Sequence, residues 1–256
     1  MASTVTLEGV KKAVFFPLRG EKWGMKLLIG SALSFASYII PILPIFPIFG
    51  YFWRIMHQII VKDEDPGMPE WNDWGKLFLD GIKVFGVYLI YLLPALILAI
   101  GGYVLFFVLD FSLVFSATSA GQYSSNAFPS AMIGSAIGMF VGIAIAMLGL
   151  VLIYVTLIFI PPALGNMIEK NDFMAAFHFK EWWPLFKANL SGYAIAIAIA
   201  LGLFTLMYIL AVALYATVIL CFLLPFALCL IFFVFGAVSS SLYAIAYRDA
   251  LRTRTG

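Results

Sequence analysis

The chain has 256 residues, of which 64% are hydrophobic and only 11% are charged, with a formal net charge of +2. Ordinary soluble domains contain roughly 45–50% apolar and about 25% charged residues. This composition excludes a soluble globular protein, a disordered chain and a disulfide-framed secreted module. The small net charge, without a long tract of lysine or arginine, also argues against nucleic acid as a partner.

Long uncharged runs predict the fold class. Four of them occur, at residues 27–53, 84–109, 111–168 and 188–247. Each exceeds the ~20 residues that cross a ~30 Å hydrocarbon layer as a helix. Backbone amides must be bonded inside the protein in a bilayer, so such runs specify helices. We predict an all-α, polytopic integral membrane protein that forms a single helical membrane domain over residues 1–256.

The N-terminal residues 1–22 are predicted to form an interfacial segment. They are basic but lack the apolar core of about 7–15 residues that marks a cleavable signal peptide. The stretch from Leu7 to Arg19 is amphipathic, which is typical of a helix lying in the headgroup plane.

The first apolar run contains Pro41, Pro44 and Pro47. Proline removes a helical hydrogen bond and clashes with the preceding turn, so this cluster predicts a break. We expect two short helices, at about 23–40 and 45–61, in a hairpin that either crosses the bilayer or is re-entrant. The alternative is one tilted first span, which leaves the basic N-terminus outside.

The second hairpin follows a loop over residues 62–83 that is rich in acidic residues and tryptophan and is predicted to be cytoplasmic. The acidic residues Asp63, Glu64 and Asp65 lack the ligand spacing of an EF-hand, which favours a solvated loop over a cation site. A polar, turn-rich stretch predicts an external loop over 110–130, followed by a long helix at about 131–160.

The third hairpin is predicted to follow an amphipathic interfacial segment over residues 169–189, with helices at about 190–213 and 217–246. All three hairpins have a similar entrance, in which an acid precedes tryptophan and a basic residue. The entrances begin at Glu21, Glu70 and Glu181. This weak repeat supports three hairpins, although tryptophan and lysine are enriched at any membrane interface.

The distribution of lysine and arginine predicts the topology. There are 5 before residue 27, none in 110–130, 4 in 54–83, 3 in 162–189 and 3 after 247. Positively charged flanks stay on the cytoplasmic side of the cell membrane. We therefore expect both termini in the cytoplasm, with about six membrane-embedded helices arranged as three hairpins plus short interfacial helices.

Small residues recur every four positions in the long helix after the polar loop, and we assign Gly134, Gly138 and Gly142 to helix packing. Helices associate in lipid where small residues let their backbones approach. The partner helix can belong to the same chain or to a second copy.

The motif Pro69-Glu70-Trp71-Asn72-Asp73-Trp74-Gly75-Lys76-Leu77-Phe78-Leu79-Asp80-Gly81 carries a family resemblance. It is similar to the recurring core of an uncharacterised family of bacterial and archaeal multi-pass membrane proteins, the domain of unknown function DUF4013. The likeness extends over most of the chain, from about residue 20 to 250. It implies a multi-pass membrane fold, but no activity, cofactor or site residue.

The sequence lacks the patterns of an enzyme. The two histidines, His57 and His178, are far apart, and HExxH, GxSxG, P-loop and CxxC motifs are missing. The uncharged runs hold no ionisable residue, which disfavours a proton-coupled carrier. We expect no catalytic activity, no metal site and no cofactor.

One polar cluster remains as a candidate site. Arg54, His57 and Gln58 lie close to one face of the second short helix and are candidates for contact with a lipid headgroup phosphate. Two other interpretations remain: snorkelling of these side chains to the interface, or a pigment or metal held by His57.

The expected function is that of a non-enzymatic accessory or structural membrane subunit, which acts through helix packing and contacts the lipid bilayer, other membrane proteins or itself. The alternative is a small permease or channel with a path beside the proline-broken hairpin. That path would bring hydroxyl-bearing residues to one cavity, either Ser31, Ser34, Ser37, Tyr38, Tyr154 and Thr156 or the cluster Ser239, Ser240 and Ser241.

Overall fold

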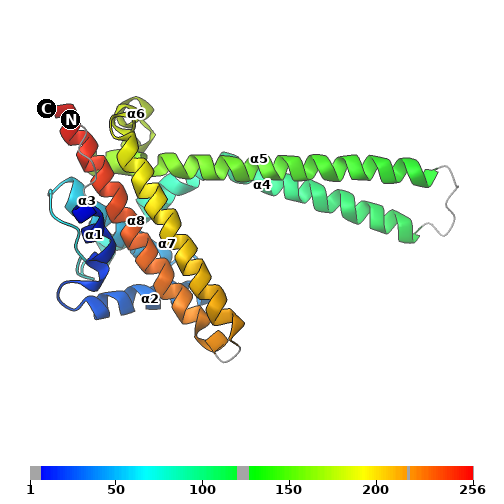
Figure 1. Cartoon of the computed structure of the whole chain (residues 1–256). Coiled ribbons are helices and arrows are strands. Elements are labelled where there is room, and N and C mark those ends of the chain that lie inside the picture. Colours follow the sequence, from blue (N-terminus) through cyan, green and yellow to red (C-terminus); the bar gives the residue numbers. More distant parts are fainter. Residues whose placement is uncertain (1–6, 120–126, 218–219, 256) are drawn as a thin grey trace. The chain divides into compact units, whose positions relative to one another are not determined.

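The computed structural model describes residues 7–119, 127–217 and 220–255, and every regular element in these ranges is a helix (Figure 1). The chain divides into two compact units. Unit 1 comprises Met1–Val87 and Ile160–Gly256, and unit 2 comprises Tyr88–Phe159. The all-helical fold class is therefore confirmed.

The helices occur in the following order: α1 (Leu7–Phe15), η1 (Phe16–Leu18), α2 (Trp23–Ile39), α3 (Ile45–Ile60), α4 (Trp74–Ser119), α5 (Ala127–Lys170), η2 (Phe173–Phe177), α6 (Phe179–Ala188), α7 (Leu190–Ala216), η3 (Leu220–Leu223) and α8 (Leu224–Thr255). The elements η1, η2 and η3 are short 3₁₀ helices. The long helices α4 and α5 each contribute residues to both units.

Four helices in the described ranges, α4, α5, α7 and α8, are long and apolar enough to cross a membrane. The short helices α2 and α3 have 17 and 16 residues, fewer than the ~20 that a full crossing needs. The structure thus shows four candidate spans, and the predicted count of about six is not reached by length and composition. The break between α2 and α3 falls where the proline cluster predicts it.

Helix α4 continues well into the stretch that we predicted as an external loop. The predicted loop 110–130 is helical up to Ser119 and again from Ala127, while residues 120–126 lie outside the described ranges. Serine, alanine and threonine at 116–119 do not break a helix, and Pro129 sits in the first turn of α5, where its missing N–H costs little. The prediction of a loop over the whole range was wrong.

The other predicted boundaries also shift. Of the predicted loop 62–83, only the part before Trp74 is outside a helix. Helix α5 runs to Lys170 through Pro161 and Pro162, well past the predicted end near residue 160. Both prolines are buried, so packing of this helix end offsets the hydrogen bonds that they remove.

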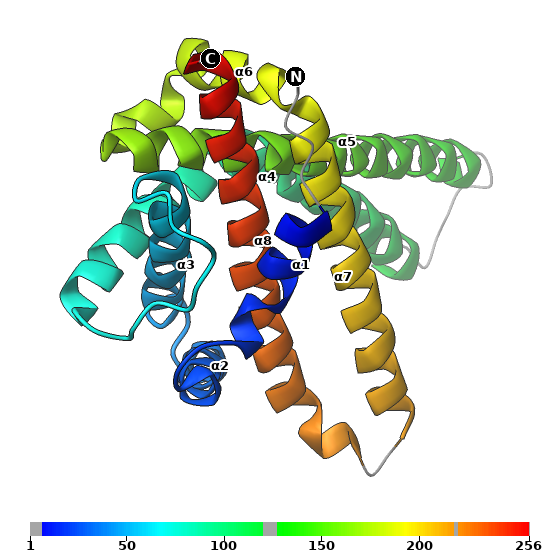
Figure 2. The same cartoon turned by 60° about the vertical axis from the view of Figure 1, so that its left-hand side comes forward.

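Helix α8 lies at the centre of unit 1 and contacts α1, α2, α3, α6 and α7 (Figure 2). Its side chain Phe233 is fully buried. The ring of Phe233 lies against Gly30 of α2, and Gly236 of α8 receives the ring of Phe52 from α3. Glycine on one helix thus accommodates an aromatic ring from the next, which locks α8 to the first hairpin.

Helix α3 crosses the first turns of α4 with their backbones in contact. A Cβ added to Gly50 would overlap the backbone carbonyl of Leu77, and one added to Gly81 would overlap that of Phe46. The two glycines therefore permit a closeness that no other residue allows at either position. This crossing brings the loop between α3 and α4 back against α3, where it is bonded to Tyr51 and Arg54.

Unit 2 is a pair of antiparallel helical segments that touch through small residues. The backbone of α4 at Gly102 lies against α5 at Gly142 and Ala146, and Ala99 lies against Gly149. Long apolar side chains point outwards from both segments, as shown by the exposure of Phe107, Phe140 and Tyr154 among others. Small residues face the partner helix, and large residues cover the outside.

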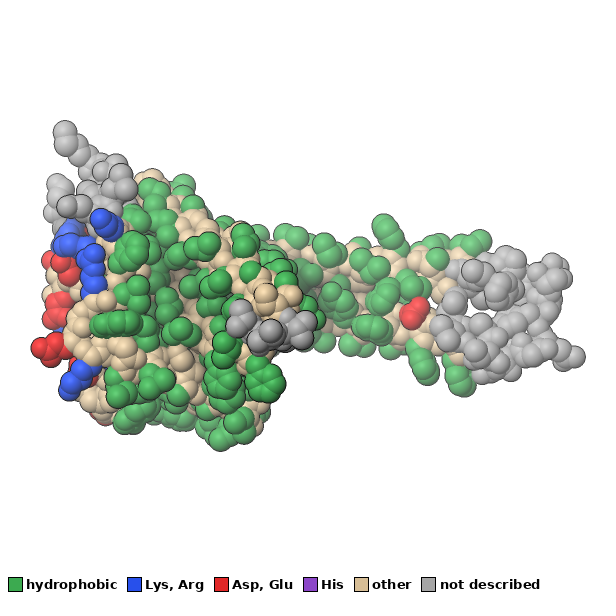
Figure 3. All heavy atoms as spheres, turned by 60° about the horizontal axis from the view of Figure 1, so that its bottom comes forward, with side chains coloured by type: hydrophobic (Ala, Val, Ile, Leu, Met, Phe, Trp, Pro, Cys, Tyr) green, Lys and Arg blue, Asp and Glu red, His purple; other side chains and the backbone are tan. Residues whose placement is uncertain are grey.

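In Figure 3, the charged side chains of unit 1 gather at one end, and apolar side chains predominate elsewhere on the face of unit 1 that is coloured by type. Two ion pairs tie three chain segments together at this end. Lys12 of α1 lies 2.9 Å from Asp65, and Arg252 of α8 lies 2.5 Å from Asp63. The first and last described helices therefore contact the same acidic loop.

Candidate functional site

The loop that carries the family-like motif is bound to the first hairpin by a buried lysine. Lys26 of α2 donates a hydrogen bond to the carbonyl oxygen of Met68 at 2.8 Å and forms an ion pair with Glu70 at 2.7 Å. Only 8% of Lys26 is exposed. The Lys26 ammonium, which is hydrogen-bonded to the Glu70 carboxylate, lowers the pKa of that carboxyl.

Arg54 of α3 binds the next part of the same loop. Its guanidinium donates to the carbonyl oxygen of Glu70 at 3.1 Å, to Oδ1 of Asn72 at 2.7 Å and to the carbonyl oxygen of Asp73 at 3.2 Å. All three acceptors are neutral oxygens. Arg54 therefore shapes the loop while its positive charge stays uncompensated by these partners.

Aromatic residues pack against the loop and donate hydrogen bonds at its contact with α2 and α3. The indole N–H of Trp71 donates to the carbonyl oxygen of Lys26 at 3.0 Å, and its ring stacks on Tyr51 at 4.1 Å between centroids. The hydroxyl of Tyr51 donates to the carbonyl oxygen of Pro69 at 2.9 Å. Phe233 of α8 packs against both rings. We call residues 68–74, with Lys26, Tyr51 and Arg54, the α3–α4 clasp.

A cavity of about 520 Å³ opens beside the clasp. Its size lies within the range of about 300–1,000 Å³ that is typical of ligand pockets. Ten residues, all in unit 1, line it: Trp53, Arg54, His57 and Gln58 of α3, then Lys62, Pro69, Glu70, Asn72 and Asp73 of the loop, and Lys76 of α4. We call this space the rim cavity.

All three residues that the sequence analysis selected, Arg54, His57 and Gln58, line the rim cavity. The ring of His57 stacks on Trp53 at 4.8 Å. Sequence reasoning missed Lys62 and Lys76, which come from opposite ends of the loop. The sequence does show many charged residues between 62 and 76, but this clustering does not reveal which side chains line the same cavity.

The family comparison agrees with the motif that builds the clasp. The family model described as "Protein of unknown function (DUF4013)" matches residues 33–216, which is well over half of the chain. The chain belongs to the DUF4013 family. No curated protein and no solved structure is found to match it. In this DUF4013 member, Glu70 and Trp71 of the motif are bonded to the first hairpin, so both have a structural role.

A second polar cluster joins α5, α6 and α8 in the DUF4013 chain. The amide of Asn166 donates to the carbonyl oxygen of Ala175 at 2.8 Å and to Glu181 at 3.0 Å. Tyr247 of α8 donates to Glu169 at 2.6 Å. Lys170 lies 2.6 Å from Glu181. We call these residues the α5–α6 clasp.

The electrostatics of the α5–α6 clasp favour the ionised form of Glu181. Hydrogen bonds from Lys170 and then from Asn166 lower the pKa of Glu181 from the ordinary value of 4.5 to about 2. Nearby, the indole N–H of Trp182 donates to the carbonyl oxygen of Ala176 at 3.1 Å. The cluster therefore combines a charged carboxylate with a buried tryptophan, whereas Trp71 of the α3–α4 clasp is half-buried.

Two of the three predicted hairpin entrances thus share their chemistry. At Glu70-Trp71 and Glu181-Trp182, the carboxylate pairs with a lysine and the indole donates to a backbone carbonyl. At the remaining entrance Trp23 begins α2 and is 43% exposed. The similarity in sequence therefore reflects a common way of closing a turn at two sites.

The predicted helix-packing glycines lie in different surroundings within unit 2. A Cβ on Gly142 would lie 2.8 Å from the backbone nitrogen of Phe106, whereas one on Gly138 would lie 2.6 Å from a methyl carbon of Leu109. Gly134 has nothing within 4 Å. The segments α4 and α5 separate towards their connected ends (Figure 1), so Gly134 meets no helix of this chain there, and its packing against a second copy stays a prediction.

The acidic loop offers no free ligand set. Asp63 is bound by Arg252 and also by Arg248 at 3.4 Å, and Asp65 is bound by Lys12. The hydrogen bond from Arg252 lowers the pKa of Asp63. Across the described residues, no group of three His, Cys, Asp or Glu side chains is placed to hold a metal ion.

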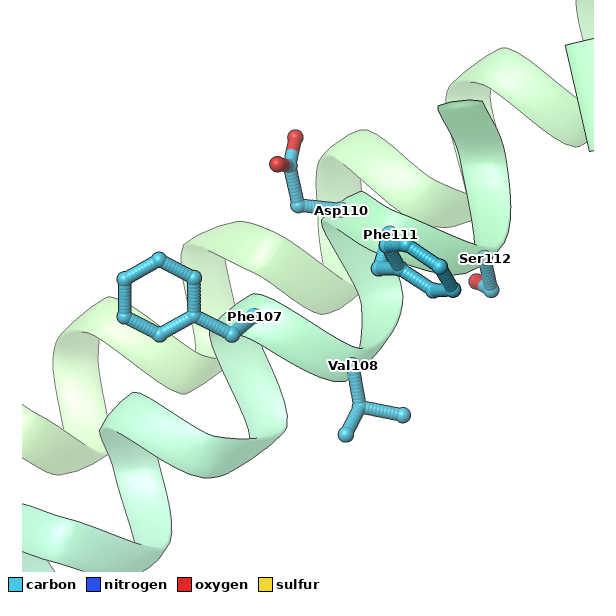
Figure 4. Close-up of a pocket in the computed structure, with 5 residues that line it drawn as sticks. All are labelled: Phe107, Val108, Asp110, Phe111 and Ser112. Carbon is cyan, nitrogen blue, oxygen red and sulfur yellow. The ribbon is translucent and has the colours of Figure 1, made fainter. Parts of the chain in front are cut away.

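Unit 2 has an open recess of about 660 Å³ along α4, lined by Phe107, Val108, Asp110, Phe111 and Ser112. The side chains leave one stretch of the helix in different directions (Figure 4). The hydroxyl of Ser112 donates to the carbonyl oxygen of Leu109 at 2.9 Å. The polar groups of the recess do not converge on a common point. The rim cavity is therefore the stronger candidate for a ligand-binding site.

Proposed function

We propose that this chain is a non-enzymatic, multi-pass membrane protein that serves as an accessory or structural subunit. It acts through helix packing and through contacts with lipid, other membrane proteins or a second copy of itself. The observation that carries this proposal is the apolar surface that three of the four candidate spans in the described ranges leave uncovered. The proposal includes neither a cofactor nor a nucleic-acid partner.

The uncovered surface is unevenly distributed among the spans. Helix α8 buries half of its most apolar 18-residue stretch, whereas α4 and α5 bury 17% each and α7 buries 11%. Side chains as large as Phe140 and Tyr154 are 75% and 71% exposed. Apolar surface of this extent requires lipid or protein around it. A subunit that is built around α8 and presents its other spans to neighbours fits this distribution.

We further propose that both termini lie in the cytoplasm of a cell-membrane protein. The ion pairs of Lys12 and Arg252 with the acidic loop support a common side for the first helix, the loop and the last helix. The positive-inside rule makes that side cytoplasmic. After replacement of Cys221 and Cys229, an impermeant thiol reagent applied to intact cells should label Ser124→Cys but not Ser3→Cys or Thr253→Cys. Labelling of all three would contradict this topology.

The alternative function, a small permease or channel, has one observation in its favour. The hydroxyls of Ser239 and Ser241 on α8 are buried and have no hydrogen-bond partner among the described residues. Against it, Ser31, Ser34 and Ser37 each donate to a carbonyl oxygen four residues earlier in α2. Their hydroxyls are thereby satisfied within the helix and are poorly placed to line a polar path.

A native preparation tests the subunit role. The full chain is extracted from its own membrane in polymer nanodiscs, with a photo-crosslinking residue at Phe140 and, in a matched control, at buried Phe233. We expect a stoichiometric membrane protein in the preparation and protein adducts from position 140 but not 233. The subunit role would be rejected if the preparation contained the chain alone. Solute flux through the chain in proteoliposomes would then favour the permease.

A further inference from the structure

The charges that face the rim cavity are not balanced. Arg54 bonds to neutral oxygens only, as described above, and among the described residues neither Lys62 nor Lys76 forms an ion pair with a carboxylate. Glu70 is neutralised by Lys26 from outside the cavity. Asp73 is the remaining carboxylate in the lining. Three cations therefore face one uncompensated anion.

The three cations come from different elements that meet at the rim cavity. Lys62 follows the C-terminal end of α3, and Lys76 lies in the first turn of α4. Both interact electrostatically with the ring of His57, as do the carboxylates of Asp80 and Glu64, which do not line the cavity. Gln58 adds an amide to the same lining. Lysine and arginine around a space of this size suit an anion with several oxygen acceptors, above all a phosphate group.

Exposed apolar side chains that lie near Lys62 and Lys76 in the sequence favour a lipid over a free ion. Val61 precedes Lys62 and is 47% exposed, while Trp74 and Leu79 of α4 are 47% and 61% exposed. A molecule that combines a phosphate with acyl chains can satisfy both the cations and this apolar border. Inorganic phosphate can satisfy the cations alone.

We propose that the rim cavity binds the phosphate group of an anionic membrane lipid through Arg54, Lys62 and Lys76, with the acyl chains against Val61, Trp74 and Leu79. This proposal rests on the proposed function, which places the chain in a membrane. It specifies the class of lipid that the chain contacts. The α3–α4 clasp is then the wall that positions Arg54, and the bound lipid joins the end of α3 to the start of α4.

The test measures lipid retention on the purified full chain by native mass spectrometry, with nanodiscs of phosphatidylcholine containing phosphatidylglycerol. The test variant is Lys62→Gln/Lys76→Gln. The matched control is Lys11→Gln/Lys180→Gln, which removes the same charge from exposed positions outside the cavity. A Lys62→Arg/Lys76→Arg variant keeps the charge.

We expect the wild type, the control and the arginine variant to retain phosphatidylglycerol. The cavity variant should bind it roughly tenfold or more weakly, because it lacks two of the three cations that contact the phosphate. Equal losses in the cavity variant and the control would overturn the proposal, because the attraction would then come from overall charge. If the glutamine variant does not fold, failure of the arginine variant to retain the lipid in preference to phosphatidylcholine would equally overturn it.

A second measurement separates the two sources of phosphate. Inorganic phosphate is added to the detergent-solubilised wild type, and its melting temperature is compared with that of the cavity variant. Stabilisation by phosphate alone, without preference for phosphatidylglycerol, would replace the lipid by a free anion and contradict the proposal. A chain that inserts in membranes but shows no cavity-dependent retention refutes this site only, whereas a chain that does not insert refutes the proposed function as well.

Discussion

The packing inside unit 1 and the packing inside unit 2 depend on different interactions. In unit 1, hydrogen-bonded lysine, arginine, tryptophan and tyrosine side chains close the helix ends, and α8 provides a buried centre. In unit 2, two helical segments meet through glycine and alanine, and large side chains point away from the contact. Each unit thus has its own route to a defined packing in an apolar environment.

The difference in packing between the two units follows from the surroundings of each unit. In lipid, apolar side chains gain little by moving from acyl chains to another helix, so unit 2 depends on close backbone approach for its packing. At the charged end of unit 1, polar groups are available to make directional bonds. Substitutions should therefore act through steric overlap in unit 2, and through both overlap and lost hydrogen bonds in unit 1.

The largest effect is expected at the backbone crossing of α3 and α4 in unit 1. Gly50→Ala and Gly81→Ala place a methyl group on a backbone carbonyl that cannot move aside. We expect a loss of about 3 kcal/mol or more, at or above the upper end for overpacking, measured as a fall in melting temperature in detergent. Gly75→Ala is the control, because nothing lies within 4 Å of its position. Equal melting temperatures for all three would contradict the crossing.

A smaller effect is expected from opening the α3–α4 clasp. Arg54→Leu removes three hydrogen bonds to the loop, and we expect a loss of about 2 kcal/mol, typical of bonds to a charged group. Hydrogen exchange should accelerate in residues 68–74 and stay unchanged in unit 2. Arg19→Leu, at an exposed position, serves as the control. Unchanged exchange in the loop would show that Arg54 does not hold it.

A graded series within unit 2 tests whether small residues alone define its packing. Gly142→Ala should cost about 1–2 kcal/mol because the new methyl group meets backbone atoms. Gly138→Ala should cost less, since the side chain of Leu109 can rotate away, and Gly134→Ala should have no cost. Hydrogen exchange of residues 95–110 reports on each variant. A reversed order would mean that other contacts set the distance between the helices.

The smallest effect concerns pH and the α5–α6 clasp. Because the pKa of Glu181 is about 2 in the folded chain against an ordinary 4.5, its bonds add stability above pH 4.5. That contribution should decrease as the pH falls from 4.5 towards about 2. Melting temperatures of the wild type and of Glu181→Gln should differ at pH 7 and converge at low pH. A constant difference would show that Glu181 is not the titrating group.

The extent of prediction from the sequence can be judged from particular elements. The prolines at 41–47 marked the break between α2 and α3, because proline acts on its own turn of helix. The polar stretch at 116–119 misled us, because serine and threonine permit a loop but do not require one. Of the residues that line the rim cavity, the sequence predicted Arg54, His57 and Gln58, because they share one helix face. It did not predict Lys62 and Lys76, because they lie on other elements.

The sequence by itself determined that this is an apolar, helical, membrane-type chain of the DUF4013 family, with its charges confined to a few segments. Composition and helical breaks are local properties, and local residues suffice to specify them. The tertiary structure alone decided which distant groups meet. Lys26 and Glu70 are joined across 44 positions, and Asp63 and Arg252 across 189. Such pairs depend on how the helices pack, and packing is set by close steric and polar fit, which a linear pattern does not contain.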